Sequence, residues 1–329
     1  MRTRQFGRTG RDVSEIGFGT WGIGGAQWVE VDDDEAIKAL HTALASGITF
    51  IDTADVYGDG RSEKLIARAL RERKGPKPFI ATKAGKRLPA QEVRGYTAEN
   101  LKTWVERSLK NLEVDRLDLV QLHCPPTELY YHPEVFEALD GLVAEGKLAS
   151  YGVSVEKIEE AIKAIEYPNV VSVQIIYNML RQRPEDLFFE RAKQKNVAII
   201  ARVPLASGLL SGKFTAKSTF DPADHRNFNR NGEAFDVGET FSGVPFEKGL
   251  EVIEKIRPLV PGDGTMAQFA LRWILMNDAV TVVIPGARTA EQSRANAAAD
   301  DLAPLSSETM VRIKAIYDAD VKPYVHHRW

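Results

Sequence analysis

Four residues with acid–base side chains follow closely on short apolar runs of this sequence. Three of these runs end in Asp52, Lys83 and His123, and Tyr57 lies five positions after the first of them. A phenol can donate a proton near neutral pH when an adjacent ammonium lowers its pKa from about 10. General acids work best when their pKa is close to the working pH. The pattern therefore predicts a proton-transfer site in which Tyr57 is the donor.

Each of these residues also has an ordinary structural explanation when it is taken singly. An aspartate after a strand often caps a turn, and a single lysine is usually solvated. A single histidine is often a hydrogen-bonded structural residue. Their occurrence at three successive strand ends favours one shared site. A half-buried Lys83 would need a counter-charge, and Asp52 can supply it.

Eight apolar segments of strand length alternate with amphipathic helical patterns along the chain. We expect strands at residues 15–20, 49–52, 79–83, 118–123, 150–154, 170–174, 198–202 and 280–284. This order fits an α/β fold of the closed (β/α)8 TIM-barrel type, formed as one domain over residues 1–329. An open doubly wound sheet is the alternative. The count of eight and the lack of a domain-splitting linker favour the barrel.

The barrel would give the polar residues a common place, because the C-terminal strand ends line the active site in this fold. Two segments are additional to the eight strand–helix units of a minimal barrel. Residues 3–13 are expected to form an N-terminal β-hairpin that could close the bottom of the barrel. Residues 207–248 form a long loop after strand seven, and loops of this length are usually functional or disordered. Five of its phenylalanines, Phe220, Phe228, Phe235, Phe241 and Phe246, argue against disorder.

Bulk composition argues against several classes of function. A net charge of -3 over 329 residues, with scattered Lys and Arg, does not suit a nucleic-acid partner. The apolar runs are too short to span a membrane, and the N-terminus lacks the apolar segment of a signal peptide. The single cysteine, Cys124, excludes an intrachain disulfide and favours a reducing cytoplasm. No Cys/His spacing suggests a metal site.

Two glycine-containing segments bear on cofactor binding. Residues 17–22 match GxGxxG, but the helix and the later acidic residue of the dinucleotide fingerprint do not follow, so we reject a Rossmann domain. Residues 281–289 pass from a strand into a helix expected at 290–298. A helix N-terminus beside Gly286 and Arg288 suits a phosphate. An ordinary turn with a surface arginine is the alternative.

Taken together, these segments resemble the aldo-keto reductases. The similarity rests on residues 19–21, 51–58, 62–63, 82–83, 118–123, 151–154, 173–174, 204–213 and 284–288. These motifs follow one another in the family's order over nearly the full chain. The most similar subgroup is the bacterial one related to general stress reductases and potassium-channel β subunits.

The resemblance implies a TIM barrel that binds NADPH without a Rossmann domain, with NADH as the alternative cofactor. It also implies a role for each of the four polar residues. Tyr57 would give a proton to the substrate carbonyl oxygen, and Lys83 would lower the pKa of Tyr57. Asp52 would keep Lys83 charged, and His123 would orient the carbonyl.

The same resemblance implies a set of cofactor-binding residues. They are Gly19, Thr20, Trp21, Asp52, Ser154, Gln174, Arg202, Pro204, Leu205, Ser207, Gly208, Leu210, Lys213, Ile284, Gly286, Arg288, Gln292 and Asn296. Two positions depart from the family pattern. Val155 stands where an Asn often holds the nicotinamide amide, and Arg202 stands where a Tyr often stacks on the nicotinamide. A guanidinium plane can also stack.

We therefore expect an NADPH-dependent reductase that converts aldehydes, and as a further class ketones, to alcohols. A module that binds NADPH as a redox sensor with little turnover is the second hypothesis, and an unrelated TIM-barrel hydrolase or isomerase is the third. The substrate pocket is expected to be lined by Trp21, Trp28, Tyr57, His123 and Tyr130, and completed by the long loop and residues 323–329. Such walls accept many small carbonyl compounds. The sequence gives no indication of an oligomeric state.

Overall fold

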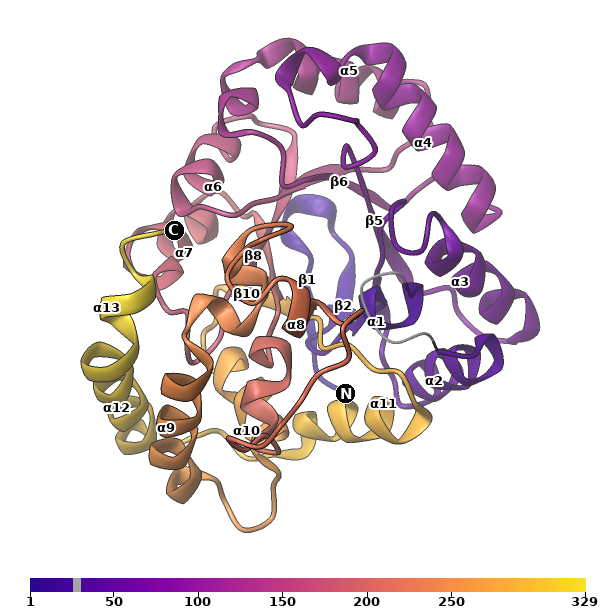
Figure 1. Cartoon of the computed structure of the whole chain (residues 1–329). Helices are drawn as coiled ribbons and strands as arrows, with labels where there is room; N and C mark the ends of the chain where they lie inside the picture. Colours follow the sequence, from indigo (N-terminus) through magenta and orange to yellow (C-terminus); the bar gives the residue numbers. More distant parts are fainter. Residues whose placement is uncertain (26–30) are drawn as a thin grey trace.

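The computed structural model describes residues 1–25 and 31–329, and its centre is a ring of eight parallel strands (Figure 1). In chain order these are β3 (Phe18–Gly19), β4 (Phe50–Asp52), β5 (Phe79–Ala84), β6 (Leu119–His123), β7 (Tyr151–Ser154), β8 (Val170–Ile176), β9 (Ala198–Arg202) and β10 (Val280–Val283). Each strand pairs with the next, and backbone hydrogen bonds join the two ends of this order. Gly17 N donates to Val283 O at 2.8 Å and Gly19 N to Pro285 O at 3.0 Å. The predicted barrel is confirmed.

Helices surround the barrel on its outside (Figure 1). The longer ones are α2 (Asp33–Ala45), α3 (Arg61–Glu72), α4 (Ala98–Leu112), α5 (Pro133–Ala144), α6 (Ile158–Ala164), α7 (Pro184–Gln194), α9 (Phe246–Ile256), α10 (Met266–Leu275), α11 (Ala290–Ala297) and α12 (Ser307–Ile316). The shortest are α1 (Trp21–Gly24), α8 (His225–Phe228) and α13 (Lys322–Val325). Side-chain caps fix several helix starts; Asp32 accepts from the first turn of α2 and Thr289 from that of α11. None of the helices in the described ranges is long and apolar enough to cross a bilayer.

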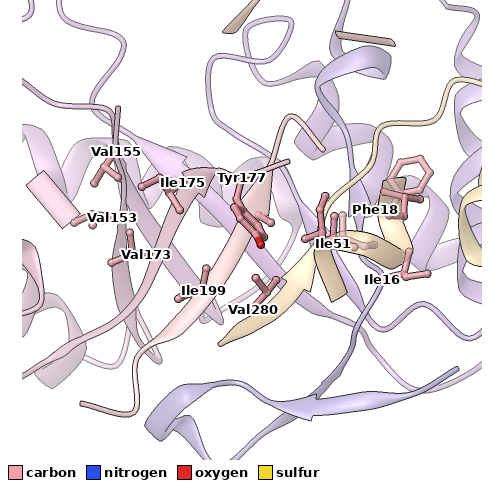
Figure 2. Packing of buried hydrophobic residues seen from close by; sticks show 14 of the residues in the cluster. Ile16, Phe18, Ile51, Val153, Val155, Val173, Ile175, Tyr177, Ile199 and Val280 are labelled. Atoms are coloured by element: carbon pink, nitrogen blue, oxygen red, sulfur yellow. The ribbon is translucent and has the colours of Figure 1, made fainter. Parts of the chain in front are cut away.

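The main core lies between the strands and the surrounding helices. Val153, Val173, Ile199 and Val280 are register partners on β7 to β10 and form one apolar row across the sheet (Figure 2). All four are fully buried. β-Branched residues suit such rows because they pack well on a pleated surface. This row fixes the register of the strands whose ends carry polar residues.

The N-terminal hairpin covers the start of the barrel strands, as the sequence suggested. Strands β1 (Thr3–Gln5) and β2 (Asp12–Ser14) pair in antiparallel fashion. Between them, Phe6 packs on Phe50 and Phe79, with ring centroids 5.5 and 4.8 Å apart. Phe50 and Phe79 are the first residues of β4 and β5, so the hairpin closes the barrel at the N-terminal strand ends. The C-terminal strand ends, at the opposite end of the barrel, are therefore left open to form a site.

The long connection after β9 is ordered by aromatic packing. It contains the short turns 206–211, 237–239 and 241–243 as well as α8. Phe220, Phe241 and Phe246 cluster with Phe214, at ring separations of 5.0 to 6.5 Å. The expectation that phenylalanines order this loop agrees with this packing.

Candidate active site

A buried ion pair between Lys83 and Asp52 forms the floor of the site. Lys83 Nζ donates to Asp52 Oδ1 at 2.5 Å and to the carbonyl oxygen of Thr53 at 2.9 Å. The side chains of Lys83 and Asp52 are only 1% and 4% exposed. They come from neighbouring parallel strands, so the sheet itself holds them together.

Two glutamine amides complete the surroundings of Asp52. Its Oδ2 accepts from Gln174 Nε2 at 2.7 Å and from Gln121 Nε2 at 3.3 Å. All polar atoms of the carboxylate therefore have partners, as a buried charge requires. Gln174 was expected to bind the cofactor, and in this structure its amide nitrogen donates to Asp52. Gln121 was not identified from the sequence, although its place two residues before His123 puts it on the same face of β6.

Tyr57 and His123 meet above this pair. Lys83 Nζ lies 3.4 Å from Tyr57 Oη. The rings of Tyr57 and His123 have centroids 6.0 Å apart and are nearly perpendicular. The four residues that the sequence singled out thus converge at one place. Their roles stay predictions.

The loop that carries Tyr57 is shaped by glycine and held from α4. Gly58 has a φ of +60°, and a Cβ at that position would lie 1.9 Å from the carbonyl oxygen of Gly24. Only glycine fits such a close approach in this conformation. Arg107, on α4, donates to the carbonyl oxygens of Asp55 and Asp59 at 3.0 and 2.8 Å. Both contacts fix the backbone on either side of Tyr57.

The pKa of Tyr57 shifts in the direction opposite to our expectation. Burial raises it well above 10, and the charges of Asp52 and Glu239 add to the effect. The ammonium of Lys83 does not reverse this shift because its charge is paired with Asp52 at 2.5 Å. The phenol is therefore protonated at physiological pH. This is the form that a proton donor needs, but Lys83 alone does not activate it.

His123 is a neutral imidazole in this site. Burial lowers its pKa well below 6.5, and the charges of Lys83 and Lys86 lower it further. Its Nδ1 is buried and has no hydrogen-bond partner within the described ranges. A neutral imidazole has one N–H donor and one acceptor. It can therefore donate one hydrogen bond to an uncharged carbonyl oxygen.

Arg202, at the end of β9, is enclosed by two carboxylates that were not identified from the sequence. Its guanidinium donates to Glu156 Oε2 at 3.1 Å and to the carbonyl oxygen of Val155 at 2.9 Å, and it also pairs with Glu239. Glu156 lies two residues past Ser154, so its strand-end position was a usable signal. Glu239 lies in the long loop, where no periodic pattern points to it.

Trp21 joins the site to the long loop. Its ring lies 6.4 Å from that of Tyr57 and 4.9 Å from that of His225 on α8. Trp28 lies outside the described residues. Tyr130 is fully buried, so it does not line an open mouth as we expected, because the turn 127–131 packs it into the core beside α6.

The expected phosphate-binding residues lie on two neighbouring segments, after β9 and after β10. On the first, Ser207 Oγ donates to the carbonyl oxygen of Glu239 at 2.8 Å, and Gly208 has a φ of +93°. On the second, Arg288 N donates to Gln292 Oε1 at 2.8 Å and Asn296 Nδ2 to the carbonyl oxygen of Gly286 at 3.1 Å. Pro204, Leu205, Leu210 and Lys213 lie along the first segment; Gly19, Thr20 and Ile284 lie where β3 meets β10.

These segments fit an anionic cofactor. Burial lowers the pKa of Arg288, and the neighbouring charge of Arg226 lowers it further. The carboxylate of Asp224, which pairs with Arg226 at 2.5 Å, acts on the pKa of Arg288 in the opposite direction. A guanidinium group such as that of Arg288 is well suited to bind a phosphate. The capped N-terminus of α11 adds backbone donors and the positive end of the helix dipole. The donor set suits the phosphates of a dinucleotide.

Asp55 is a further buried carboxyl on the Tyr57 loop. It is fully buried, and neither of its oxygens has a hydrogen-bond partner in the part of the chain that is described. Burial, with the nearby charge of Glu63, raises its pKa to about 7. The sequence offered no signal for this, because an acid in a loop is usually solvated.

Asp55→Asn should remove a pH dependence of stability. In the unfolded chain the carboxyl titrates near 3.8, so the folded state binds its proton more tightly between about pH 4 and 7. The wild-type protein should therefore lose stability as pH rises through this window. Relative to Asp55→Asn, we expect a loss of roughly 2–3 kcal/mol between pH 5 and 8, measured by urea unfolding. A constant difference at the two pH values would contradict the assignment.

Comparison with known proteins gives consistent similarities. The model of the Aldo/keto reductase family matches residues 15–318. Aldo-keto reductase YhdN of Bacillus subtilis is 32% identical, over 87% of this chain and 85% of its own. A probable voltage-gated potassium channel subunit beta of Arabidopsis thaliana is 28% identical, over 93% of both chains. The holo form of aldo-keto reductase AKR11C1 from Bacillus halodurans superposes with a TM-score of 0.78, at 27% identity and 99% coverage of both chains.

Proposed function

Because this chain belongs to the aldo/keto reductase family and is thus an oxidoreductase, we propose that it reduces aldehydes, and as a further class ketones, to alcohols with NADPH. One observation carries the proposal: Tyr57 Oη lies 3.4 Å from Lys83 Nζ, which is paired with Asp52, and the Tyr57 ring packs edge-to-face with that of His123. A carbonyl oxygen that gains electrons needs such donors around it.

Each residue has a distinct task in this proposal. His123 donates a hydrogen bond that orients the carbonyl oxygen, and Tyr57 delivers the proton to that oxygen. When bound, the reduced nicotinamide supplies the hydride. Lys83 stabilises the phenolate that remains on Tyr57, and Asp52 compensates the ammonium before and after the transfer. Arg202, paired with Glu156 and Glu239, would stack its guanidinium on the nicotinamide.

The proposal has a direct test. Loss of NADPH absorbance is followed with 4-nitrobenzaldehyde and methylglyoxal, and the series is repeated with NADH. We expect turnover of both aldehydes, with a lower KM for NADPH. Tight NADPH binding without turnover over a broad aldehyde panel would instead favour the sensor hypothesis. The similarity to a probable potassium channel subunit is the reason to test that hypothesis. We do not retain the hydrolase or isomerase hypothesis, because the chain belongs to a family of oxidoreductases.

The composition of the chain also agrees with the partner and the cellular location that we propose. The proposed partner is a small carbonyl compound, and neither a nucleic acid nor a membrane is required. A cytoplasmic location suits a chain whose single cysteine, Cys124, is buried and unpaired with another cysteine.

Arg288 should decide between the two cofactors. We propose that its guanidinium binds the 2′-phosphate that NADPH has and NADH lacks. Arg288→Ala should raise the Kd for NADPH by about 10-fold or more, since a charge-assisted hydrogen bond is lost, and leave that for NADH within about twofold. Fluorescence titration measures both. Arg294→Ala, on the exposed side of the same helix, is the matched control. Equal weakening of the two cofactors would contradict this role.

A further inference from the structure

Trp329 is buried against the long connection that follows β9. Only 4% of the residue is exposed. Its indole Nε1 donates to both carboxylate oxygens of Asp236, at 3.0 and 3.1 Å. The guanidinium of Arg181, itself buried, lies 3.5 Å from the centre of the indole ring on its face. A cation over an indole and a hydrogen bond to a carboxylate are both strengthened by such burial.

Two glycines of the loop make room for this ring. A Cβ at Gly243 would lie 2.4 Å from the Trp329 ring, and one at Gly238 would lie 3.2 Å from it. Gly243 also has a φ of +78°. The segment 236–243 therefore matches the indole in shape as well as in hydrogen bonding. We call this segment the indole seat.

The indole seat is directly continuous with the proposed cofactor site. Asp236, the partner of Trp329, also accepts from Gly238 N at 2.7 Å and so starts the turn Val237–Glu239. Glu239, at the end of that turn, pairs with Arg202. The carbonyl oxygen of Glu239 accepts from Ser207 Oγ at 2.8 Å, and Ser207 Oγ accepts from Phe241 N at 3.2 Å.

The loop is thus tied at two points on opposite sides of one short turn. The inner tie is the Glu239–Arg202 pair and the outer tie is the Asp236–Trp329 pair. Arg202 and Ser207 are both residues that we propose to touch NADPH. Movement of the turn away from the barrel would have to break both ties.

We propose that Trp329 is a positioning residue that holds the indole seat against the barrel, and thereby slows the dissociation of NADPH. The inference rests on the proposed function, since it assumes that NADPH binds between Arg202 and the loop. It assigns Trp329 no contact with the reacting atoms. Loss of the indole frees the turn, so Glu239 releases Arg202 more often and the cofactor leaves sooner.

The test is the rate of NADPH dissociation, followed by its fluorescence after mixing with excess NADP+. Trp329→Ala should raise this rate about 10-fold, because a hydrogen bond to a buried carboxylate and the ring contact with Arg181 are both lost. Trp329→Phe should lie in between, since it keeps an aromatic ring that can pack under Arg181 but loses part of the indole with its N–H donor. In a single turnover at saturating NADPH, the rate of hydride transfer should stay within about twofold for all variants.

Two further variants make the test specific. Asp236→Ala should raise the rate at least as much as Trp329→Phe, because it removes the acceptor of the indole N–H together with that of Gly238 N. The double variant Trp329→Phe, Asp236→Ala should be little faster than Asp236→Ala alone, since the hydrogen bond is already lost. Tyr324→Ala, at an exposed residue of the same tail, should leave the rate unchanged. If Trp329→Ala does not fold, Trp329→Phe and Asp236→Ala still decide the question.

The outcomes separate this inference from the proposed function. A wild-type protein that binds NADPH, with dissociation rates equal in Trp329→Phe, Asp236→Ala and wild type, would overturn the role of Trp329 alone. A wild-type protein that binds no NADPH would overturn the proposed function, and this inference with it.

Discussion

Tyr57→Phe should lower kcat for aldehyde reduction by about two to four orders of magnitude, which is the usual contribution of a positioned general acid. The change removes only the hydroxyl that lies 3.4 Å from Lys83 Nζ. The ring stays, and with it the packing against Trp21 and His123. We therefore expect the Kd for NADPH to change less than about twofold. Steady-state kinetics with 4-nitrobenzaldehyde and a fluorescence titration of NADPH measure the two quantities.

The matched control for this variant is Tyr131→Phe, since Tyr131 is 67% exposed and lies outside the site. It should leave both kcat and the Kd for NADPH unchanged. A Tyr57→Phe enzyme that kept more than about one tenth of the wild-type kcat would show that another group delivers the proton.

Much of this site could be predicted because the barrel repeats one geometric rule. Parallel strands end at the same rim, so strand-end residues such as Asp52 and Lys83 must lie close together once the register is set. Apolar runs of strand length were sufficient to locate the strands. The hairpin before the barrel was also predictable, since glycines bracket its turn.

The contacts that sequence reasoning did not find depend on side chains that are distant along the chain. Glu239 reaches Arg202 from a loop without periodicity, and Trp329 reaches Asp236 from the far end of the sequence. Nothing local distinguishes these residues from solvated ones. The expected lowering of the Tyr57 pKa was wrong for a related reason. The sequence places Lys83 beside Tyr57, but the balance between burial and the paired charge of Lys83 depends on the three-dimensional site.

Lys83→Met should reduce the free energy of unfolding by about 3–5 kcal/mol, the usual cost of removing one member of a buried ion pair. The Asp52 carboxylate would stay in the barrel with only the amides of Gln121 and Gln174 as partners. Turnover should fall as well, since no ammonium remains to stabilise the phenolate of Tyr57. Urea unfolding followed by circular dichroism measures the stability. Lys314→Met, which breaks the exposed pair with Asp318, is the matched control and should leave the stability nearly unchanged.

The double variant Asp52→Asn, Lys83→Met separates stability from chemistry. It lacks both charges of the buried pair, and the new carboxamide oxygen at position 52 can still accept from Gln174. We therefore expect it to recover about 2 kcal/mol or more relative to Lys83→Met, because the penalty of the single variant comes mainly from the unpaired carboxylate. Turnover should not recover, since the ammonium is still absent. Recovery of both quantities would mean that the pair serves only the fold. Recovery of neither would mean that Lys83 acts through its packing, because the charge of Asp52 would then contribute nothing to the loss.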